Sequence, residues 1–288
     1  MIRSWTPPYP LDIEATVGQH RRGTGDPAMC YDPDGSVWRA SHTPDGPGTL
    51  RLRAHAGTVE AEAWGPGGPW LIEQFPDLLG AADDPTALAT DDPVVQRLQR
   101  QGNGMRLGRT DRVWEALVPA VLEQKVVGTE AWRAWRYLLR THGEPAPGPD
   151  TGLRVPPRRE DWAAIPSWDW HRSGAEPVRM RTITRATAMD VERGVDHLTS
   201  LRGIGPWTAA EVRRRALGDP DAVPVGDYHL PKVVGHTLIG EPVDDAGMLE
   251  LLEPFTGQRG RVVRLCELYG SRPARRGPRM SVRDYRAF

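Results

Sequence analysis

The segment that most restricts the fold of this chain is LRGIGPWTA, residues 201–209. Gly203 and Gly205 stand between a predicted helix that ends and one that Pro206 suits at its first position. Glycine lets the backbone turn tightly and approach another backbone closely. The pattern therefore predicts two helices joined by a very short turn.

The backbone amides of such a turn, and of the helix N-terminus next to it, suit a phosphate oxygen. Contacts of this kind position a nucleic acid without reading its sequence. A bare G-x-G also occurs in ordinary turns between helices. The interpretation therefore depends on the residues that come after the turn.

The segment PVGDYHLPK, residues 224–232, places Asp227 at a predicted helix start with an aromatic residue, Tyr228, beside it. An aspartate there is commonly an N-cap. A carboxylate fixed beside a DNA-binding turn also suits the deoxyribose of an extruded nucleotide, where it stabilises the cationic sugar that forms as the base departs. The sequence leaves both roles open.

Together these segments resemble the helix-hairpin-helix (HhH-GPD) DNA glycosylase superfamily, in which a hairpin L-x-G-[IV]-G precedes a Gly/Pro-rich turn and the catalytic aspartate. VLEQKVVGTEAW, residues 121–132, looks like another helix of the family. An alternating, β-like stretch from Ser36 to Ile72 is similar to the accessory domain of the 3-methyladenine DNA glycosylase II branch.

The resemblance implies that Asp227 is the catalytic carboxylate. It assigns DNA-backbone binding to Gly203, Ile204 and Gly205. Strand-cutting branches carry a Schiff-base lysine where this chain has Trp207, so a monofunctional hydrolase without a cofactor is implied. The residues expected to line the base pocket are Trp207, Trp132, Tyr228 and Glu211.

Two positions depart from the family pattern. Glu211 stands one turn after Trp207, where an aromatic residue is expected; it either reaches the pocket or pairs with Arg214 or Arg215. Lys125 stands near the residue that fills the gap left by an extruded base, and the wedge candidates are Gln124 and Lys125. A lysine does not fill a base stack as an apolar side chain does, so the alternative role for Lys125 is contact with phosphate. The arginines at 213–215 are expected to be solvated.

Charge is divided unevenly along the chain. Residues 1–95 carry 6 Arg against 14 Asp and Glu, whereas residues 96–288 carry 31 Lys and Arg against 24 Asp and Glu. The second part therefore suits contact with phosphate, and the acidic first part is expected to brace it. Two cysteines are too few for an iron–sulfur cluster, and the histidines show no metal-ligand spacing.

These patterns predict an α+β chain with a small N-terminal antiparallel β domain and a mostly α-helical HhH-GPD glycosylase domain. The expected boundaries are 1–93 for the β-rich domain and linker, 94–270 for the helical domain, and 271–288 for a basic C-terminal tail. No long apolar run or signal peptide is visible, so we expect a cytoplasmic protein, by default a monomer.

The predicted function is hydrolytic excision of alkylated bases, of the 3-methyladenine and 7-methylguanine type, from double-stranded DNA in base excision repair. No metal is expected. Two alternatives stay open: a glycosylase for other damaged or mismatched bases, and a non-catalytic DNA-binding protein that keeps the hairpin.

Overall fold

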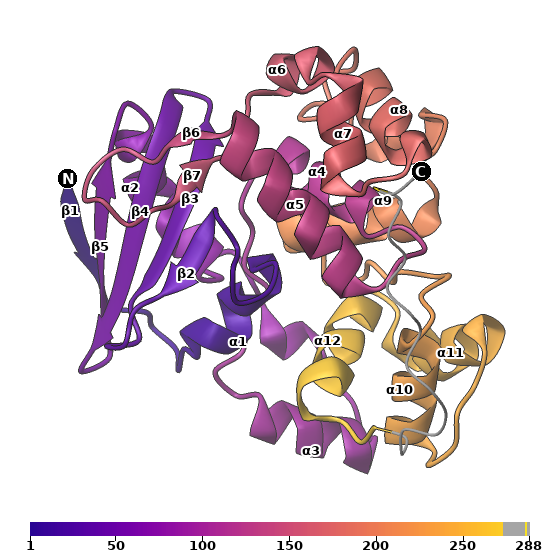
Figure 1. Cartoon of the computed structure of the whole chain (residues 1–288). Coiled ribbons are helices and arrows are strands. Elements are labelled where there is room, and N and C mark those ends of the chain that lie inside the picture. The colour runs from indigo at the N-terminus through magenta and orange to yellow at the C-terminus, as the bar shows by residue number, and fades with distance from the viewer. Residues whose placement is uncertain (273–285, 287–288) are drawn as a thin grey trace.

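The computed structural model describes residues 1–272 and 286, and places a sheet beside two groups of helices (Figure 1). A small antiparallel N-terminal sheet with a mostly helical remainder confirms the predicted α+β class. Within the described range, no helix is long and apolar enough to span a membrane. The predicted tail at 271–288 lies almost entirely outside the described residues.

The sheet has five antiparallel strands in the order β1-β5-β4-β3-β2. Their bounds are β1 (Ile2–Trp5), β2 (Met29–Tyr31), β3 (Val37–Thr43), β4 (Gly46–His55) and β5 (Thr58–Trp64). Alternate residues of β5 are buried, as the period of a strand requires. They form a core with helix α2 (Gly68–Leu78), which covers one face.

The β-like pattern predicted to reach Ile72 ends earlier in the structure. Strand β5 stops at Trp64, and Gly65 turns the chain with a φ of 86°. Pro69 then falls in the first turn of α2, where its fixed φ is compatible with a helix. Residues 68–72 are therefore helical, which corrects the strand prediction there.

The helical part contains two separate hydrophobic clusters. The first is built mainly from α4 (Val113–Leu122), α5 (Gly128–His142), α6 (Arg159–Ala164), α7 (Ser167–Ser173), α8 (Pro177–Ala186) and α9 (Pro206–Val212). The second is built mainly from α1 (Ile13–Val17), α3 (Pro93–Gln101), α10 (Leu230–Leu238), α11 (Asp245–Leu252) and α12 (Arg259–Tyr269). The predicted division into 1–93 and 94–270 stays a prediction, although α3 does begin at Pro93.

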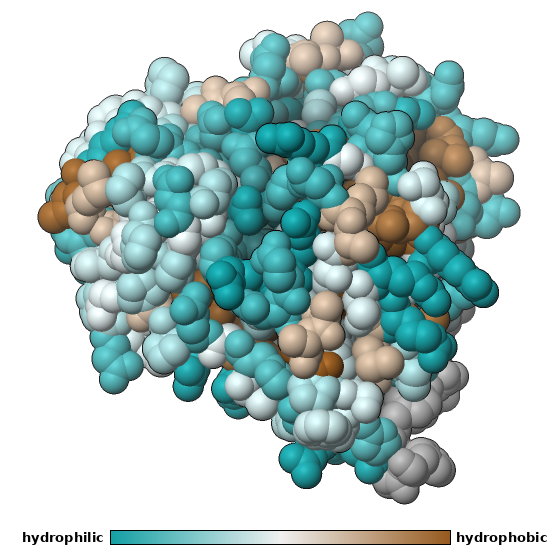
Figure 2. Space-filling view, turned by 90° about the horizontal axis from the view of Figure 1, so that it is seen from above, coloured by the Kyte–Doolittle hydropathy of each residue, from teal (hydrophilic) through white to brown (hydrophobic). Residues whose placement is uncertain are grey.

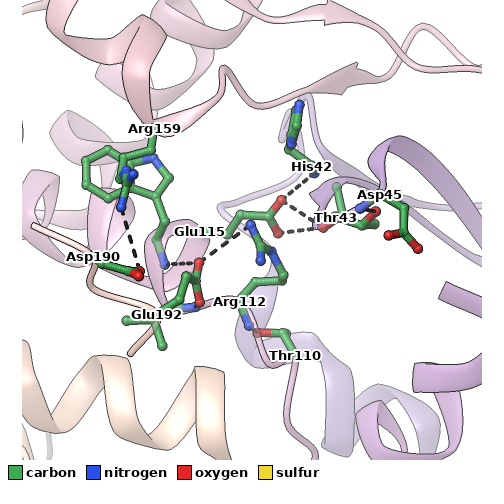
Figure 3. Close-up of polar contacts among 12 residues, drawn as sticks. His42, Thr43, Asp45, Thr110, Arg112, Glu115, Arg159, Asp190 and Glu192 are labelled. Carbon is green, nitrogen blue, oxygen red and sulfur yellow. Dashed lines mark hydrogen bonds and ion pairs between the residues drawn. The ribbon is translucent and has the colours of Figure 1, made fainter. Parts of the chain in front are cut away.

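Helix α4 is capped from a distant part of the chain. The Glu192 carboxylate accepts hydrogen bonds from the amides of Val113, at 2.8 Å, and Trp114, at 3.1 Å (Figure 3). A carboxylate there satisfies amides that have no partner within the helix and favours its positive end. The cap of α4 is therefore supplied by a residue 79 positions further along the chain.

The sheet is docked onto the helices through Glu115 of α4. Its carboxylate accepts hydrogen bonds from Arg39 Nη2 at 2.6 Å and Ser41 Oγ at 2.7 Å. It also accepts one from the His42 amide at 2.6 Å (Figure 3). Both partners of the Arg39–Glu115 ion pair are buried, with side-chain exposures of 10% and 8%. A three-way contact of this kind fixes the orientation of β3 against α4.

A loop of the helical part returns to the sheet. The stretch after α5 forms a two-stranded ribbon, β6 (Glu144–Pro145) and β7 (Arg154–Val155). Leu153 and Val155 are buried against Trp38 and Ala40 of β3. The two parts of the molecule are thus held by apolar as well as charged contacts.

We predict that Glu115→Ala lowers the free energy of unfolding by about 3 kcal/mol, because it leaves the Arg39 guanidinium buried without its anion. The matched control is Glu73→Ala, which removes the exposed ion pair with Arg3 and should change stability by less than about 1 kcal/mol. Urea unfolding measures both. Equal effects of the two substitutions would contradict the docking role of Glu115.

Candidate active site

The predicted turn between helices is present. A 3₁₀ segment, Val195–Ser200, leads into the turn, and α9 starts at Pro206. Gly203 has a φ of 102°, and a Cβ there would lie 2.3 Å from Thr182 Oγ1 of α8. Glycine is therefore required at 203 by the protein itself, both by its backbone conformation and by the close approach of α8.

The space around Gly205 is open, unlike that around Gly203. Its backbone is extended, with a φ of −102°, and a Cβ there would meet nothing within 4 Å. Nothing in the described protein requires a glycine at this position. The open space lies at the N-terminus of α9, whose first amides have no partner within the helix. This arrangement suits close approach of an anion from outside the protein.

Ile204 differs from the two glycines beside it. Its side chain is buried in the hydrophobic cluster of α4 to α9, and its amide donates to the Leu201 carbonyl at 3.0 Å. The amide assigned to DNA-backbone binding by the resemblance is thus engaged within the protein. Ile204 anchors the turn, which leaves Gly205 beside it facing outward.

Asp227 is held by three hydrogen bonds. Its Oδ1 accepts from the amides of His229, at 2.8 Å, and Leu230, at 2.9 Å, at the start of α10. Its Oδ2 accepts from Trp207 Nε1 of α9 at 3.1 Å. The carboxylate therefore caps α10 and also joins it to the hairpin helix. The two residues that the sequence places 20 positions apart meet directly.

Tyr228 does not line an enclosed pocket. Its side chain is 70% exposed, and Lys232 Nζ lies 3.8 Å from the centre of its ring. Trp132 is half-buried against the helical core, with Gly23 and Gly128 close to its ring. Of the residues expected to line the base pocket, Trp207 is the one that contacts Asp227.

Glu211 is a buried ion-pair residue, which is the second of the two roles that the sequence leaves open. Its carboxylate lies 2.9 Å from Arg214 Nη1 and 2.8 Å from Arg215 Nη2. Burial raises the pKa of the Glu211 carboxyl, but the charges of Arg215 and Arg214 outweigh that effect and the pKa lies below its ordinary value. Glu211 is therefore an anion with a structural role.

The ion pairs of Glu211 belong to a larger buried network that the sequence does not reveal. Arg215 also contacts Glu123, at 3.3 Å, and Arg214 contacts Glu267 of α12, at 2.6 Å. Arg22 contacts Glu123 at 3.3 Å. The expectation that the arginines at 213–215 are solvated is thus wrong for Arg214 and Arg215, because these side chains point into the interface between α4, α9 and α12.

The two wedge candidates are separated by their contacts. Gln124 Nε2 donates to the Gly203 carbonyl at 2.9 Å and to Thr208 Oγ1 at 2.8 Å, so this side chain is fixed on the hairpin. Lys125 is exposed at the tip of the turn between α4 and α5, with a φ of 53°. The side chain of Lys125 is therefore presented to solvent.

Within residues 1–272 and 286, no group of three or more His, Cys, Asp or Glu side chains is arranged to hold a metal ion. The cysteines Cys30 and Cys266 are both free thiols. Burial raises the pKa of the Cys266 thiol to about 12. The candidate site thus consists of a carboxylate, an indole and backbone amides.

Comparison with known proteins agrees with this geometry. No family model matches the chain. The chain is 28% identical over 247 residues to the probable bifunctional transcriptional activator/DNA repair enzyme AlkA of two Mycobacterium tuberculosis strains, a match that covers 77% of this chain. The chain spans about half the length of these curated relatives, 48% of each.

Solved structures share the fold. The 3-methyladenine DNA glycosylase from Archaeoglobus fulgidus superposes with a TM-score of 0.76 at 15% identity, covering 93% of this chain and all of that one. The 8-oxoguanine glycosylase/lyase of Clostridium acetobutylicum superposes with a TM-score of 0.72 at 12% identity, covering 94% and 99%.

The chain is therefore similar in sequence to DNA repair enzymes named AlkA and has the fold of solved DNA glycosylases.

We predict that substitution of Gly203 affects stability, whereas substitution of Gly205 affects DNA binding. Gly203→Ala should destabilise the fold by about 1–3 kcal/mol, because of its positive φ and its contact with Thr182. Gly205→Ala should leave stability within about 1 kcal/mol of wild type and weaken binding to duplex DNA, because the added methyl occupies the anion's approach. Thermal unfolding and fluorescence anisotropy measure the two effects. Unchanged affinity in Gly205→Ala would remove this residue from the DNA-binding surface.

Proposed function

We propose that this chain is a monofunctional DNA glycosylase that excises alkylated bases, of the 3-methyladenine and 7-methylguanine type, from double-stranded DNA. The observation that carries the proposal is the position of Asp227, a carboxylate fixed at a helix start and hydrogen-bonded to the hairpin tryptophan. The enzyme would act as a monomer on cytoplasmic DNA in base excision repair, without a cofactor.

The fixed carboxylate of Asp227 suits this reaction because positive charge develops on the sugar as the base leaves. Cleavage of the glycosidic bond passes through a sugar with oxocarbenium character, which a preorganised anion stabilises. Three hydrogen bonds hold the Asp227 carboxylate before substrate binds, so little reorganisation is needed during the reaction. The same carboxylate is the candidate to orient or deprotonate the attacking water.

The leaving base makes modest demands on the protein. N3- and N7-alkylated purines carry positive charge and leave readily, so no strong general acid is required. The indole of Trp207 supplies an aromatic face that attracts a cationic base and stacks on an extruded one. Its Nε1 is occupied by Asp227, which orients the ring.

The second candidate is excision of oxidised bases, which the fold similarity to an 8-oxoguanine glycosylase/lyase favours. A lyase needs an amine nucleophile, and Trp207 has none. The lysines of the chain are Lys125, on the exposed turn after α4, and Lys232, over the ring of Tyr228. We therefore favour the alkylated bases and a strand left uncut.

We predict that Asp227→Asn reduces single-turnover release of 3-methyladenine and 7-methylguanine from methylated duplex DNA by about 100-fold or more, since it removes the anion. Asparagine also caps helices, so the fold should persist. Asp244→Asn is the matched control, because Asp244 caps α11 through the Gly247 amide at 2.9 Å. It should release base at the wild-type rate and leave the abasic strand intact.

Failure of wild type to release either base, with duplex binding intact, would contradict the alkylated-base assignment. A panel of oxidised and mismatched bases would then separate the second candidate from a non-catalytic DNA-binding protein. Cleavage of the strand by wild type would contradict monofunctional hydrolysis.

Since Gln124 is tied to the hairpin, we further propose Lys125 as the side chain that enters the gap left by the extruded base. Lys125→Ala should slow base excision by about tenfold, because unstacking a base costs a few kcal/mol, and should leave thermal stability unchanged. Gln124→Ala should lower the melting temperature, since two hydrogen bonds to the hairpin are lost. Normal excision by Lys125→Ala would exclude lysine as the wedge.

A further inference from the structure

One face of α8 borders the hairpin turn. Val178, Arg181, Thr182 and Arg185 are spaced at three, four and seven residues, which places them on the same side of a helix. Thr182, in the middle of this face, is buried where its hydroxyl meets Gly203. Arg181 and Arg185 are exposed on either side of that contact.

These arginines are free of ionic partners. In the described part of the chain, the side chains of Arg181, Arg185 and the exposed hairpin residue Arg202 form no hydrogen bond or ion pair. These side chains therefore do not stabilise the fold through burial or ion pairs. Their charges remain available to a ligand.

Arg179, on the same helix, shows the contrast. Its side chain is 5% exposed, pairs with Glu176 at 2.8 Å and donates to the backbone carbonyl of Gln124. This arginine fixes α8 against the turn after α4. Helix α8 therefore uses Arg179 for structure and presents Arg181 and Arg185 on its other side.

Figure 2 looks onto the side of the molecule that carries α6, α7 and α8 at the top of Figure 1, and shows mostly hydrophilic residues with separate apolar areas. The hairpin that α8 borders has the open helix N-terminus at Gly205. The exposed arginines of α8, together with the amides of the hairpin, suit the successive phosphates of a nucleic acid strand rather than a single anion.

We infer that Arg181, Arg185 and Arg202 form a phosphate-binding row that extends the hairpin contact along the same DNA strand. Side chains four residues apart on a helix lie about 6 Å apart, which is comparable to the spacing of successive phosphates. The row rests on the proposed function, since duplex DNA is its occupant. It adds affinity without base specificity, because phosphate contacts position the duplex and do not read it.

The test is the salt dependence of binding to undamaged duplex DNA. Each phosphate neutralised contributes about 0.9 to the slope of log K against log salt. The double substitution R181Q/R185Q should therefore reduce the magnitude of the slope by about 1.8. R181K/R185K, which keeps the charges, should keep the slope near its wild-type value.

The matched control is R97Q/R100Q on α3. These two arginines are also exposed and without ion pairs in the described structure, and α3 lies at the opposite end of the molecule from α8 (Figure 1). The control removes the same net charge and should leave the slope unchanged. An equal reduction in both double variants would show a general effect of charge and overturn the row.

The outcomes separate this inference from the proposed function. An unchanged slope in R181Q/R185Q, with wild type binding DNA, overturns the row alone. Binding with the expected slopes but no base release by wild type supports the row and contradicts the glycosylase proposal. Absence of any duplex binding by wild type overturns both.

Discussion

The packing of the helical part depends on a buried carboxylate, that of Glu211. Glu211 is buried at the end of α9, and an unpaired anion there would cost several kcal/mol. Arg214 and Arg215 neutralise it. Arg214 also forms an ion pair with Glu267, and Arg215 forms one with Glu123. Because these partners come from α12 and from the end of α4, one set of ion pairs fixes the hairpin helix against both hydrophobic clusters.

This network explains how two acidic residues near the hairpin acquire different roles. Glu211 is enclosed by arginines, whereas Asp227 is bound by amides and an indole on the partly exposed side of α9. Arg214 and Asp227 nevertheless interact electrostatically. Burial lowers the pKa of Arg214, but the charges of Glu267, Glu211 and Asp227 raise it above its ordinary value. The enclosed carboxylate holds the scaffold, and the accessible one is the proposed catalytic group.

The N-terminal sheet acts on the same scaffold from outside. Arg22, in the segment that leads to β2, reaches Glu123 at the end of α4, and Trp135 of α5 donates to Asp26 at 2.9 Å. Glu115 ties β3 to α4 in turn. The acidic first part of the chain therefore meets the helical part through specific buried pairs. The arginines of α8 beside the hairpin, Arg181 and Arg185, remain exposed.

The sequence by itself determined the α+β class, the hairpin and the start of a helix after Asp227, because glycine, proline and capping residues act over a few neighbours. It did not determine which carboxylate would be buried. Glu211, Arg214 and Arg215 have the local pattern of a solvated helix surface, and only the approach of α12 and Glu123 encloses them. The cap of α4 by Glu192 and the bond between Trp207 and Asp227 likewise join distant residues. Tertiary structure decided these features, since desolvation and long-range hydrogen bonds depend on which elements pack together.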